Sequence, residues 1–312
     1  MYNTFFGLSR SPFELSPDPY FIFPSAKTKE ALASIYYAMC QRKGFVVVSG
    51  EVGTGKTLMV RCLLELLKRQ QIPFANIFNP RLSVVDFLGY MTLDLGISVP
   101  HPSKGKILQT LYTFLLEQLS KGLTTVLVVD EAHQMSPNLL EEIRLLTNLE
   151  TSKQKLMQIL LVGQPELEDK LDSYELRQVK QRIAIRCRLE ALSADETRAY
   201  IERRLMLAGA KGQATTIFPG ETVEAIYRYS RGVPRMINSI CDQAMIAAYA
   251  RQVLVVAPEM IDEVGNYYRF ERIGDRGKDP ESAVEGESPK SLNQLMQSIE
   301  SESGASMYRG FL

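Results

Sequence analysis

The residues best suited to do chemistry form a glycine-rich run that ends in a lysine and a threonine. The pattern G-x-x-x-x-G-K-[ST] is matched by Gly50, Glu51, Val52, Gly53, Thr54, Gly55, Lys56 and Thr57, with Leu58 next to it. Glycines let a loop curl around an anion, so that several backbone N–H groups point at phosphate oxygens. Lys56 would reach the β- and γ-phosphates of a nucleotide, and the Thr57 hydroxyl would hold Mg²⁺. The alternative is a chance match within a glycine-rich turn.

A second candidate is a pair of adjacent carboxylates, Asp130 and Glu131, which follows the apolar run 126–129. In open α/β sheets, ligands bind at the carboxyl ends of the strands. We expect Asp130 to hold Mg²⁺, directly or through water, and Glu131 to orient and deprotonate an attacking water. Alone, such a run is more often a strand that meets a solvated turn. Together with the phosphate loop, it predicts phosphoryl transfer to water.

Other chemistries find little support in the sequence. The histidines, His101 and His133, have no cysteine at ligand spacing, so no zinc set is expected, and we interpret His133 as local structure. The four cysteines lie far apart without a C-x-x-C pair, which argues against a zinc ribbon, a redox motif or a disulfide framework. No Ser-His-Asp or Cys-His arrangement indicates nucleophilic catalysis.

The elements that must position these residues follow from the hydrophobic pattern. Apolar runs rich in β-branched residues predict strands at 45–48, 74–78, 125–129, 159–162 and, with a weaker pattern, 183–189. Apolar residues at three- and four-residue spacing predict helices at 58–67, 84–95, 107–119 and 139–149. Because parallel strands need crossover connections, this alternation predicts an α/β fold with a five-stranded parallel sheet covered by helices on both faces.

The pattern changes after Leu192, where Ser193 and two acidic residues indicate a helix start. Helices are predicted at 194–208, 220–230, 234–250 and 258–268. We therefore expect an α/β nucleotide-binding domain with an N-terminal extension (1–192) and a small all-helical lid (193–270). Gly, Ser, Pro and Glu dominate 271–312, which predicts a disordered acidic tail. Within it, 291–300 could form a short helix on a partner or on this protein, or a transient helix without function.

Composition sets wider limits. The chain has 312 residues, 45% hydrophobic and 23% charged, which is typical of a globular protein of two domains. Neither a signal sequence nor an apolar stretch long enough to span a bilayer is found, so a cytoplasmic protein without a transmembrane segment is expected. Lys+Arg 36 against Asp+Glu 36 leaves no whole-molecule attraction to nucleic acid, although local patches remain open.

The order of the motifs, with one strand between the phosphate loop and Asp130 along the chain and a helical lid behind them, resembles AAA+ ATPases over roughly residues 1–268. The N-terminal motifs are similar to the opening of ExeA/GspA-type general-secretion ATPases; they lie at 5–8, 12–13, 17–19, 21–23 and 30–32. Also similar are ATPases of exosortase and exopolysaccharide loci. More distant are TniB/TnsC-like transposition ATPases, whose partners are DNA and recombination proteins.

The resemblance implies further site residues. Gln164 matches the polar residue at the tip of the fourth strand that senses the γ-phosphate, although a plain strand-ending turn is the alternative. Arg182 matches an arginine finger that reaches into a neighbouring subunit, with Arg177 in reserve. Arg235 matches a lid arginine that contacts phosphate in the same chain. Taken as bare sequence, these arginines would be solvated surface groups.

The sequence departs from this family at several places. Thr28 stands where secretion-type members often carry His, and Leu58 where a second Thr is common. Neither change removes a phosphate or Mg²⁺ ligand. Longer secretion ATPases continue into a transmembrane segment and a peptidoglycan-binding domain, which this sequence does not show, so cell-wall binding is not expected.

The resemblance implies an ATPase that binds ATP with Mg²⁺, self-associates into a ring or filament, and drives assembly or remodelling of an envelope-associated secretion or polysaccharide-export machine. It would be cytoplasmic, or peripheral to the inner membrane through a protein partner. One alternative is a DNA-associated ATPase of the transposition type, because the stretch 177–204 holds eight basic and four acidic residues. Another is a nucleotide-operated scaffold with slow hydrolysis, against which Glu131 argues.

Overall fold

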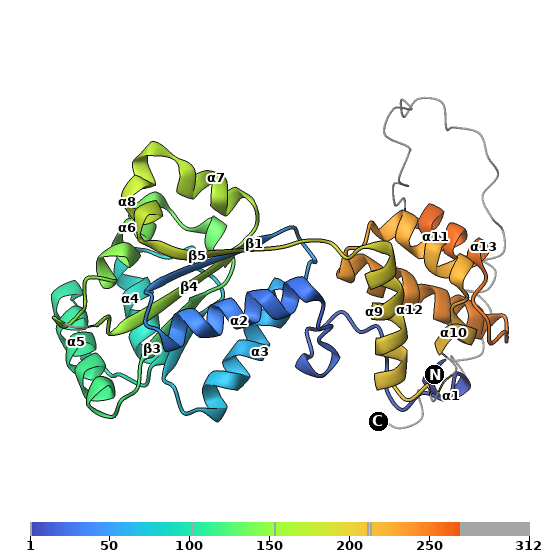
Figure 1. Ribbon diagram of the computed structural model, residues 1–312, viewed down its shortest axis with the longest axis horizontal. Coiled ribbons are helices and arrows are strands. Elements are labelled where there is room, and N and C mark those ends of the chain that lie inside the picture. Colours follow the sequence, from blue (N-terminus) through green and yellow to red (C-terminus); the bar gives the residue numbers. More distant parts are fainter. Residues whose placement is uncertain (1, 101–102, 153, 211, 213, 269–312) are drawn as a thin grey trace, which may run out of the picture.

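The computed structural model describes residues 2–100, 103–152, 154–210, 212 and 214–268. The predicted tail, 271–312, and its short helix lie outside the described residues. Figure 1 shows an α/β part and a helical part side by side, joined by the chain that leaves the last strand. Along the described parts of the chain, no helix has the length and apolar character that a bilayer crossing requires.

The α/β part is built on a five-stranded parallel sheet, as predicted. Its strand order is β2-β3-β4-β1-β5. The strands are β1 (Phe45–Gly50), β2 (Phe74–Ile77), β3 (Thr125–Val129), β4 (Met157–Gly163) and β5 (Ile183–Leu189). Although β2 follows β1 in sequence, β4 lies between β1 and β3 in space. The ends of β1, β4 and β3 are therefore neighbours, which positions three loops around one site.

Burial explains which strands had the clearest sequence signal. The three central strands are buried along their whole length, so they read as continuous apolar runs. Before its buried last residue, the edge strand β5 alternates between half-buried and exposed residues, because α2 covers one of its two faces more fully than the other is covered. The weaker pattern at 183–189 is thus the signature of an edge strand.

Helices cover both faces of this sheet. One face packs α2 (Ala26–Cys40) and α3 (Lys56–Arg69) against Val46 and Val48. The other packs α4 (Val84–Asp94), α5 (Lys104–Ser120) and α6 (Pro137–Leu146), with the short α7 (Glu166–Asp172) and α8 (Arg177–Arg182). Helices α2, α7 and α8 were not predicted. The last two have seven and six residues, too few for helical spacing to emerge.

The helical part contains α9 (Ala194–Leu207), α10 (Ala214–Ile217), α11 (Gly220–Ser230), α12 (Pro234–Ala250) and α13 (Pro258–Tyr267). The longer four lie where the sequence predicts them, within one residue at each end. Ser193 caps α9, as the sequence predicts, and Glu196 returns a bond to the cap residue, which completes a capping box.

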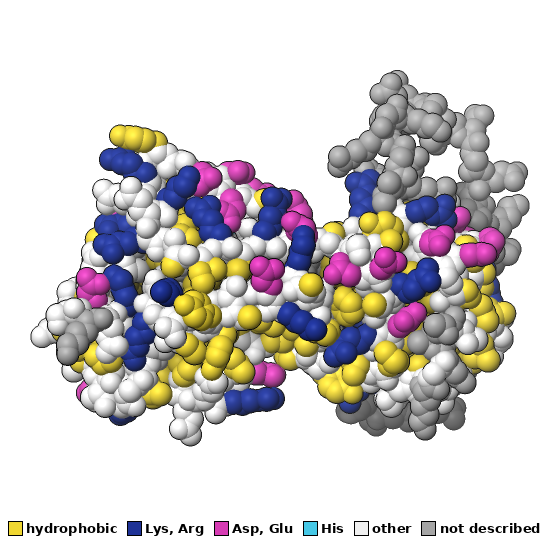
Figure 2. Space-filling model, in the orientation of Figure 1, with side chains coloured by type: hydrophobic (Ala, Val, Ile, Leu, Met, Phe, Trp, Pro, Cys, Tyr) yellow, Lys and Arg dark blue, Asp and Glu magenta, His cyan; other side chains and the backbone are white. Residues whose placement is uncertain are grey.

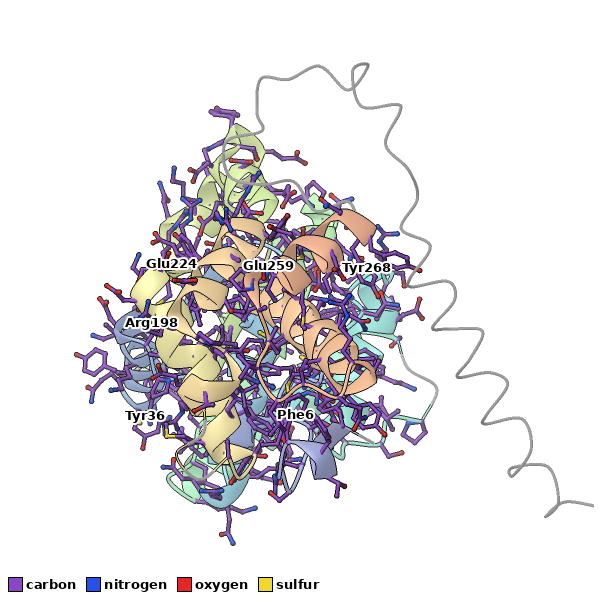
Figure 3. All side chains as sticks on the ribbon, turned by 90° about the vertical axis from the view of Figure 1, so that its right-hand side faces the viewer. Phe6, Tyr36, Arg198, Glu224, Glu259 and Tyr268 are labelled. Carbon is purple, nitrogen blue, oxygen red and sulfur yellow. The ribbon has the colours of Figure 1, made fainter. Side chains whose placement is uncertain are left out.

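The N-terminal residues pack into this helical cluster. After α1 (Tyr2–Phe5), the side chains of Phe6, Leu8 and Phe13 are buried among apolar residues of α9, α11 and α12. Helix α1 lies against α12, and Figure 3 shows Phe6 below the lid helices in that view. The division at residue 192 remains a prediction. The structure adds that the first residues of the chain share a core with the lid.

Candidate nucleotide-binding site

The phosphate loop joins the end of β1 to the start of α3, as the sequence predicts. Two glycines shape it. A Cβ on Gly50 would lie 2.6 Å from the Leu189 carbonyl oxygen on the neighbouring strand. Gly53 has a φ of +83°, and its Cβ would lie 2.8 Å from Cβ of Arg235. The loop is therefore closely packed against both β5 and the lid, at positions where a side chain would not fit.

Lys56, the first residue of α3, folds back over the loop. Its Nζ donates hydrogen bonds to the carbonyl oxygens of Gly50 at 2.6 Å and Glu51 at 2.8 Å. The side chain is buried, and this burial lowers the pKa of Lys56, an effect opposed by the nearby carboxylates of Glu131 and Asp130. A buried ammonium that is held only by carbonyl oxygens can exchange them for phosphate oxygens.

Asp130 lies next to Thr57 across the gap between β3 and the phosphate loop. Its Oδ2 accepts a hydrogen bond from the Thr57 hydroxyl at 3.0 Å, and its Oδ1 accepts one from the Glu131 N–H at 2.9 Å. Burial raises the pKa of Asp130, and these two bonds partly offset the rise. A desolvated carboxylate beside a hydroxyl is the oxygen donor set that Mg²⁺ prefers, so these residues fit the expected metal.

Glu131 meets Gln164, which lies at the tip of β4. Gln164 Nε2 approaches Glu131 Oε2 to 3.5 Å, at the limit of a hydrogen bond. Glu131 has a φ of +53°, a conformation that costs free energy in a residue other than glycine. That backbone turn directs its side chain differently from Asp130, as was expected from their adjacency. The structure thus brings three predicted residues from β3 and β4 together.

His133 lies between Glu131 and Gln164. Its Nδ1 lies 3.5 Å from Glu131 Oε2 and accepts a hydrogen bond from the Gln164 N–H at 3.4 Å. The imidazole therefore links the loops after β3 and β4. Its place two residues after Glu131 was the available sequence signal.

The lid reaches the phosphate loop through its backbone. The Arg235 N–H donates a hydrogen bond to the Gly53 carbonyl oxygen at 3.2 Å, and Val233 lies against the same glycine. The Arg235 side chain is exposed. The structure therefore brings Arg235 to the loop, whereas contact of its guanidinium with phosphate remains a prediction.

The two finger candidates lie elsewhere. Arg182 precedes β5 at the amino end of the sheet, where Ile183 pairs with Phe45, while the phosphate loop begins where Leu189 pairs with Gly50. Arg182 is exposed and donates to Asn148 Oδ1 at 3.3 Å. Arg177 is also exposed and lies 4.2 Å from the ring centroid of Tyr174. Neither arginine is brought to the phosphate loop of its own chain.

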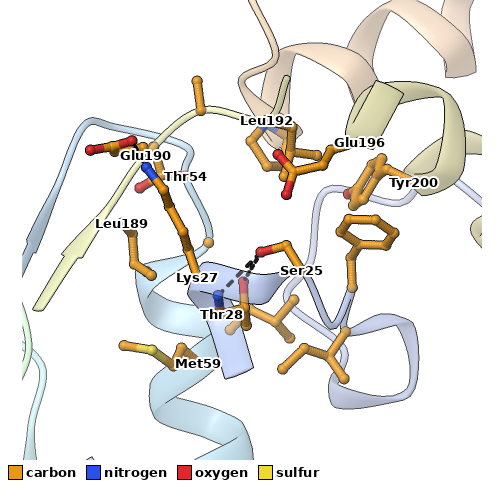
Figure 4. A pocket seen from close by; sticks show the side chains of 16 residues that line it. Ser25, Lys27, Thr28, Thr54, Met59, Leu189, Glu190, Leu192, Glu196 and Tyr200 are labelled. Atoms are coloured by element: carbon orange, nitrogen blue, oxygen red, sulfur yellow. Dashed lines mark hydrogen bonds and ion pairs between the residues drawn. The ribbon is translucent and has the colours of Figure 1, made fainter. Parts of the chain in front are cut away.

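A pocket opens beside the phosphate loop, between the sheet, the lid and the segment before α2 (Figure 4). Thr28 lies in its wall, where its hydroxyl is 2.9 Å from that of Ser25, which caps α2. Lys27 and Glu190 form an ion pair in the same wall. The remaining lining residues are Ile22, Phe23, Thr54, Gly55, Leu58, Met59, Leu189, Ala191, Leu192, Glu196, Tyr200 and Pro234.

Known proteins resemble the chain in sequence and in fold. Residues 39–171 match the family described as AAA domain. General secretion pathway protein A of Aeromonas hydrophila is 43% identical over 252 residues, which are 80% of this chain and 45% of that protein. The chain thus spans about half the length of this relative.

Solved structures show the same fold at low sequence identity. Drosophila ORC bound to DNA has a TM-score of 0.63 at 18% identity, covering 96% of this chain and 80% of that one. Aeropyrum pernix ORC2 in its ADPNP–ADP complexes has a TM-score of 0.61 at 15% identity, covering 83% and 71%.

Proposed function

Since this chain belongs to the AAA+ ATPases and is related by sequence to General secretion pathway protein A, we propose that it binds and hydrolyses Mg-ATP to drive assembly or remodelling of an envelope-associated secretion or polysaccharide-export machine. Under this proposal it acts on the cytoplasmic side of the inner membrane, held there by a protein partner. The pathway rests on the relative, whereas the chemistry rests on the site.

The observation that carries the chemistry is the hydrogen bond between Thr57 and Asp130. This bond joins the phosphate loop to the carboxyl end of β3, and Lys56 directly precedes Thr57 in the sequence. In our proposal Lys56 binds the β- and γ-phosphates, while Thr57 and Asp130 hold Mg²⁺. The metal would neutralise charge on the phosphates and fix their orientation.

The proposed base is Glu131. Its carboxylate would accept a proton from the attacking water, and Gln164 would orient that water and report the γ-phosphate. The contact between the two side chains supports a shared role, as does His133 beside them. Arg235 would contact phosphate from the lid, to which its backbone contact with Gly53 already brings it close.

A further positive charge, the guanidinium of Arg182, would come from a second subunit. Arg182 lies at the far end of the sheet from its own phosphate loop, so it would act on the nucleotide of a neighbour. We therefore propose self-association into a ring or filament. Arg177 stays in reserve, because it is equally exposed.

The DNA-associated alternative draws on the basic stretch 177–204. In the structure much of that charge is engaged. Lys180 pairs with Asp172, Arg186 pairs with Glu168, and Arg203 and Arg204 donate to backbone carbonyls of the N-terminal residues. Figure 2 shows basic side chains interspersed with acidic ones over α7 and α8. This mixture does not favour DNA over a protein partner.

The test is ATP hydrolysis measured against protein concentration, with and without duplex DNA, at two salt concentrations. We expect the rate per subunit to rise with protein concentration, because the finger is supplied by a neighbour. We expect little effect of DNA. Steep stimulation by DNA that salt abolishes would favour the transposition type, and a constant rate per subunit would argue against a shared site.

A further inference from the structure

The segment 9–23, which we call the N-terminal strap, runs from the lid to the pocket beside the phosphate loop. Figure 1 shows it crossing from the helical part toward α2. Its end contributes Ile22 and Phe23 to the pocket wall, and Phe23 lies two residues before the cap residue of α2. The strap therefore belongs to the nucleotide pocket at one end and to the lid core at the other.

Helix α9 holds the strap through a row of polar contacts. Ser9 donates from its N–H to the Ala208 carbonyl oxygen at 2.8 Å. Further along, the Tyr20 hydroxyl donates to the Leu207 carbonyl oxygen at 3.4 Å. At the pocket end, Arg203 Nε donates to the Ile22 carbonyl oxygen at 3.2 Å. These contacts follow the strap along the helix, so a rotation of the lid would carry it along.

Arg204 is the centre of this attachment. Its side chain is only 4% exposed. Its Nε donates to the Pro12 carbonyl oxygen, its Nη1 donates to the Tyr200 hydroxyl at 2.8 Å, and its Cζ lies 4.6 Å from the ring centroid of Phe21. Among the described residues none of these partners is a carboxylate. The guanidinium is thus stabilised by polar groups and ring faces, contacts that suit its planar shape.

The core also contacts the strap, because its 3-10 turn (Pro19–Phe21) lies against α3. From α3, Arg61 donates to the Pro17 carbonyl oxygen at 2.5 Å, and both partners lie toward the solvent. Apolar contacts also favour the lid, since Phe13 is fully buried against Phe218 and Phe23 packs on Tyr200. The strap thus touches both parts, but its buried polar and aromatic contacts are made with the lid, and it joins the core through the peptide before α2.

We infer that Arg204 is a positioning residue of the nucleotide pocket, which fixes the N-terminal strap to α9 so that lid and strap close on the base of a bound nucleotide as one body. This inference rests on the proposed function for the identity of the ligand. Without the contacts of Arg204, Ile22 and Phe23 would occupy their positions in the pocket wall for only part of the time. Apparent affinity falls in proportion to that fraction.

The first experiment replaces Arg204 by methionine, which keeps an unbranched apolar stem but removes the donors and the planar charge. We expect the Kd for ATP to rise about tenfold, with kcat at saturation changed less than about twofold. Arg198→Met is the matched control, because Arg198 is exposed on the same helix beside Gly220 (Figure 3). Unchanged affinity in folded Arg204→Met protein would overturn the inference.

A second variant guards against loss of folding. Arg203→Met removes only the half-buried contact to Ile22, so the protein should fold normally. We expect it to raise the Kd in the same direction by about twofold to threefold. An effect on kcat instead of Kd would contradict the positioning role.

Distance measurements test the one-body motion itself. Spin labels on unnatural amino acids would replace exposed Glu14 of the strap, Glu224 of the lid and Glu117 of the core. Before nucleotide is added, the strap-to-lid distribution should be narrow and should broaden in Arg204→Met. A strap-to-lid distribution that this substitution leaves unchanged would overturn the inference about Arg204. Because the measurement needs no ATP, this outcome is distinct from a failure of the proposed function.

With Mg²⁺ and a non-hydrolysable ATP analogue, the strap-to-core and lid-to-core distances should shift together while the strap-to-lid distance stays fixed. A lid that moves without the strap would contradict the inference.

Discussion

The two ends of the central sheet differ in how completely they assemble a site. At the carboxyl end, Lys56, Thr57, Asp130, Glu131 and Gln164 come together from the loops after three neighbouring strands. At the amino end, Arg182 is exposed and contacts an amide oxygen of Asn148. One end therefore offers candidate ligands for phosphate and metal within a single chain, and the other offers an exposed guanidinium to the outside.

A single chain therefore holds most of the expected site, while one expected cation, Arg182, lies at the opposite end of the sheet. Phosphoryl transfer gains most from positioning and from charge placed around the transferred group. If Arg182 provides such charge, the complete site exists only between two copies. The variants below separate contributions from the two ends, beginning with the largest expected effect.

Arg182→Ala should reduce kcat about 10³-fold while leaving the Kd for ATP within about twofold, because a finger acts on the transition state. Steady-state hydrolysis and equilibrium binding together check this. Arg177→Ala is the matched comparison, since it removes another exposed arginine from the same helix. If Arg177→Ala gives the loss and Arg182→Ala does not, the finger is the reserve candidate.

Glu131→Gln should keep ATP binding and reduce hydrolysis about 10²- to 10³-fold, because the amide cannot accept the proton of the water. Single-turnover hydrolysis measures this directly. Mixing Glu131→Gln with Arg182→Ala protein should restore part of the activity, since each supplies what the other lacks. Activity that stays absent in the mixture would argue that both residues serve one chain.

Lys56→Ala should weaken ATP binding about 100-fold, because two phosphates lose a buried, charge-assisted contact. Calorimetry or a fluorescent analogue would report it. Lys68→Ala, an exposed lysine near the end of the same helix, is the control. The self-association step, measured without nucleotide, should be unaffected by either substitution. If the Lys56→Ala protein still binds ATP tightly, the proposed role of the phosphate loop in binding the phosphates is wrong.

The fold was predicted well where burial is continuous. The central strands are buried on both faces, so their apolar runs were unambiguous, and the lid helices carried clear breaks at Gly232 and Pro258. Helix α2 was missed even though Ala31, Ile35 and Met39 line its buried face, because its exposed side carries the large side chains of Tyr36 and Tyr37, which blur the apolar stripe. The N-terminal extension gave no local sign of its partner, since contacts between Phe13 and Phe218 depend on the whole fold.

The site, too, could be predicted only in part from the sequence. Short motifs named the phosphate loop and the carboxylates, because their chemistry needs particular residues at fixed spacing. The place of His133 beside Glu131 depends on the left-handed turn at Glu131, which side-chain pattern does not encode. The contact of Arg235 with Gly53 joins segments far apart in the chain, so only the tertiary structure reveals it.

Gly53→Ala should give the smallest effect, a rise in the Kd for ATP of about tenfold. The new Cβ would meet Arg235 Cβ at 2.8 Å and Val233 Cγ1 at 3.0 Å, so the lid must shift away from the loop. Gly55→Ala is the sharp comparison, because its φ of +100° imposes similar backbone strain while its Cβ has nothing within 4 Å among the described residues. A lid-to-core distance that changes in Gly53→Ala and not in Gly55→Ala would assign the effect to the lid contact. Equal changes in both would assign it to the loop alone, and the carboxyl end of the sheet would then bind nucleotide without help from Arg235.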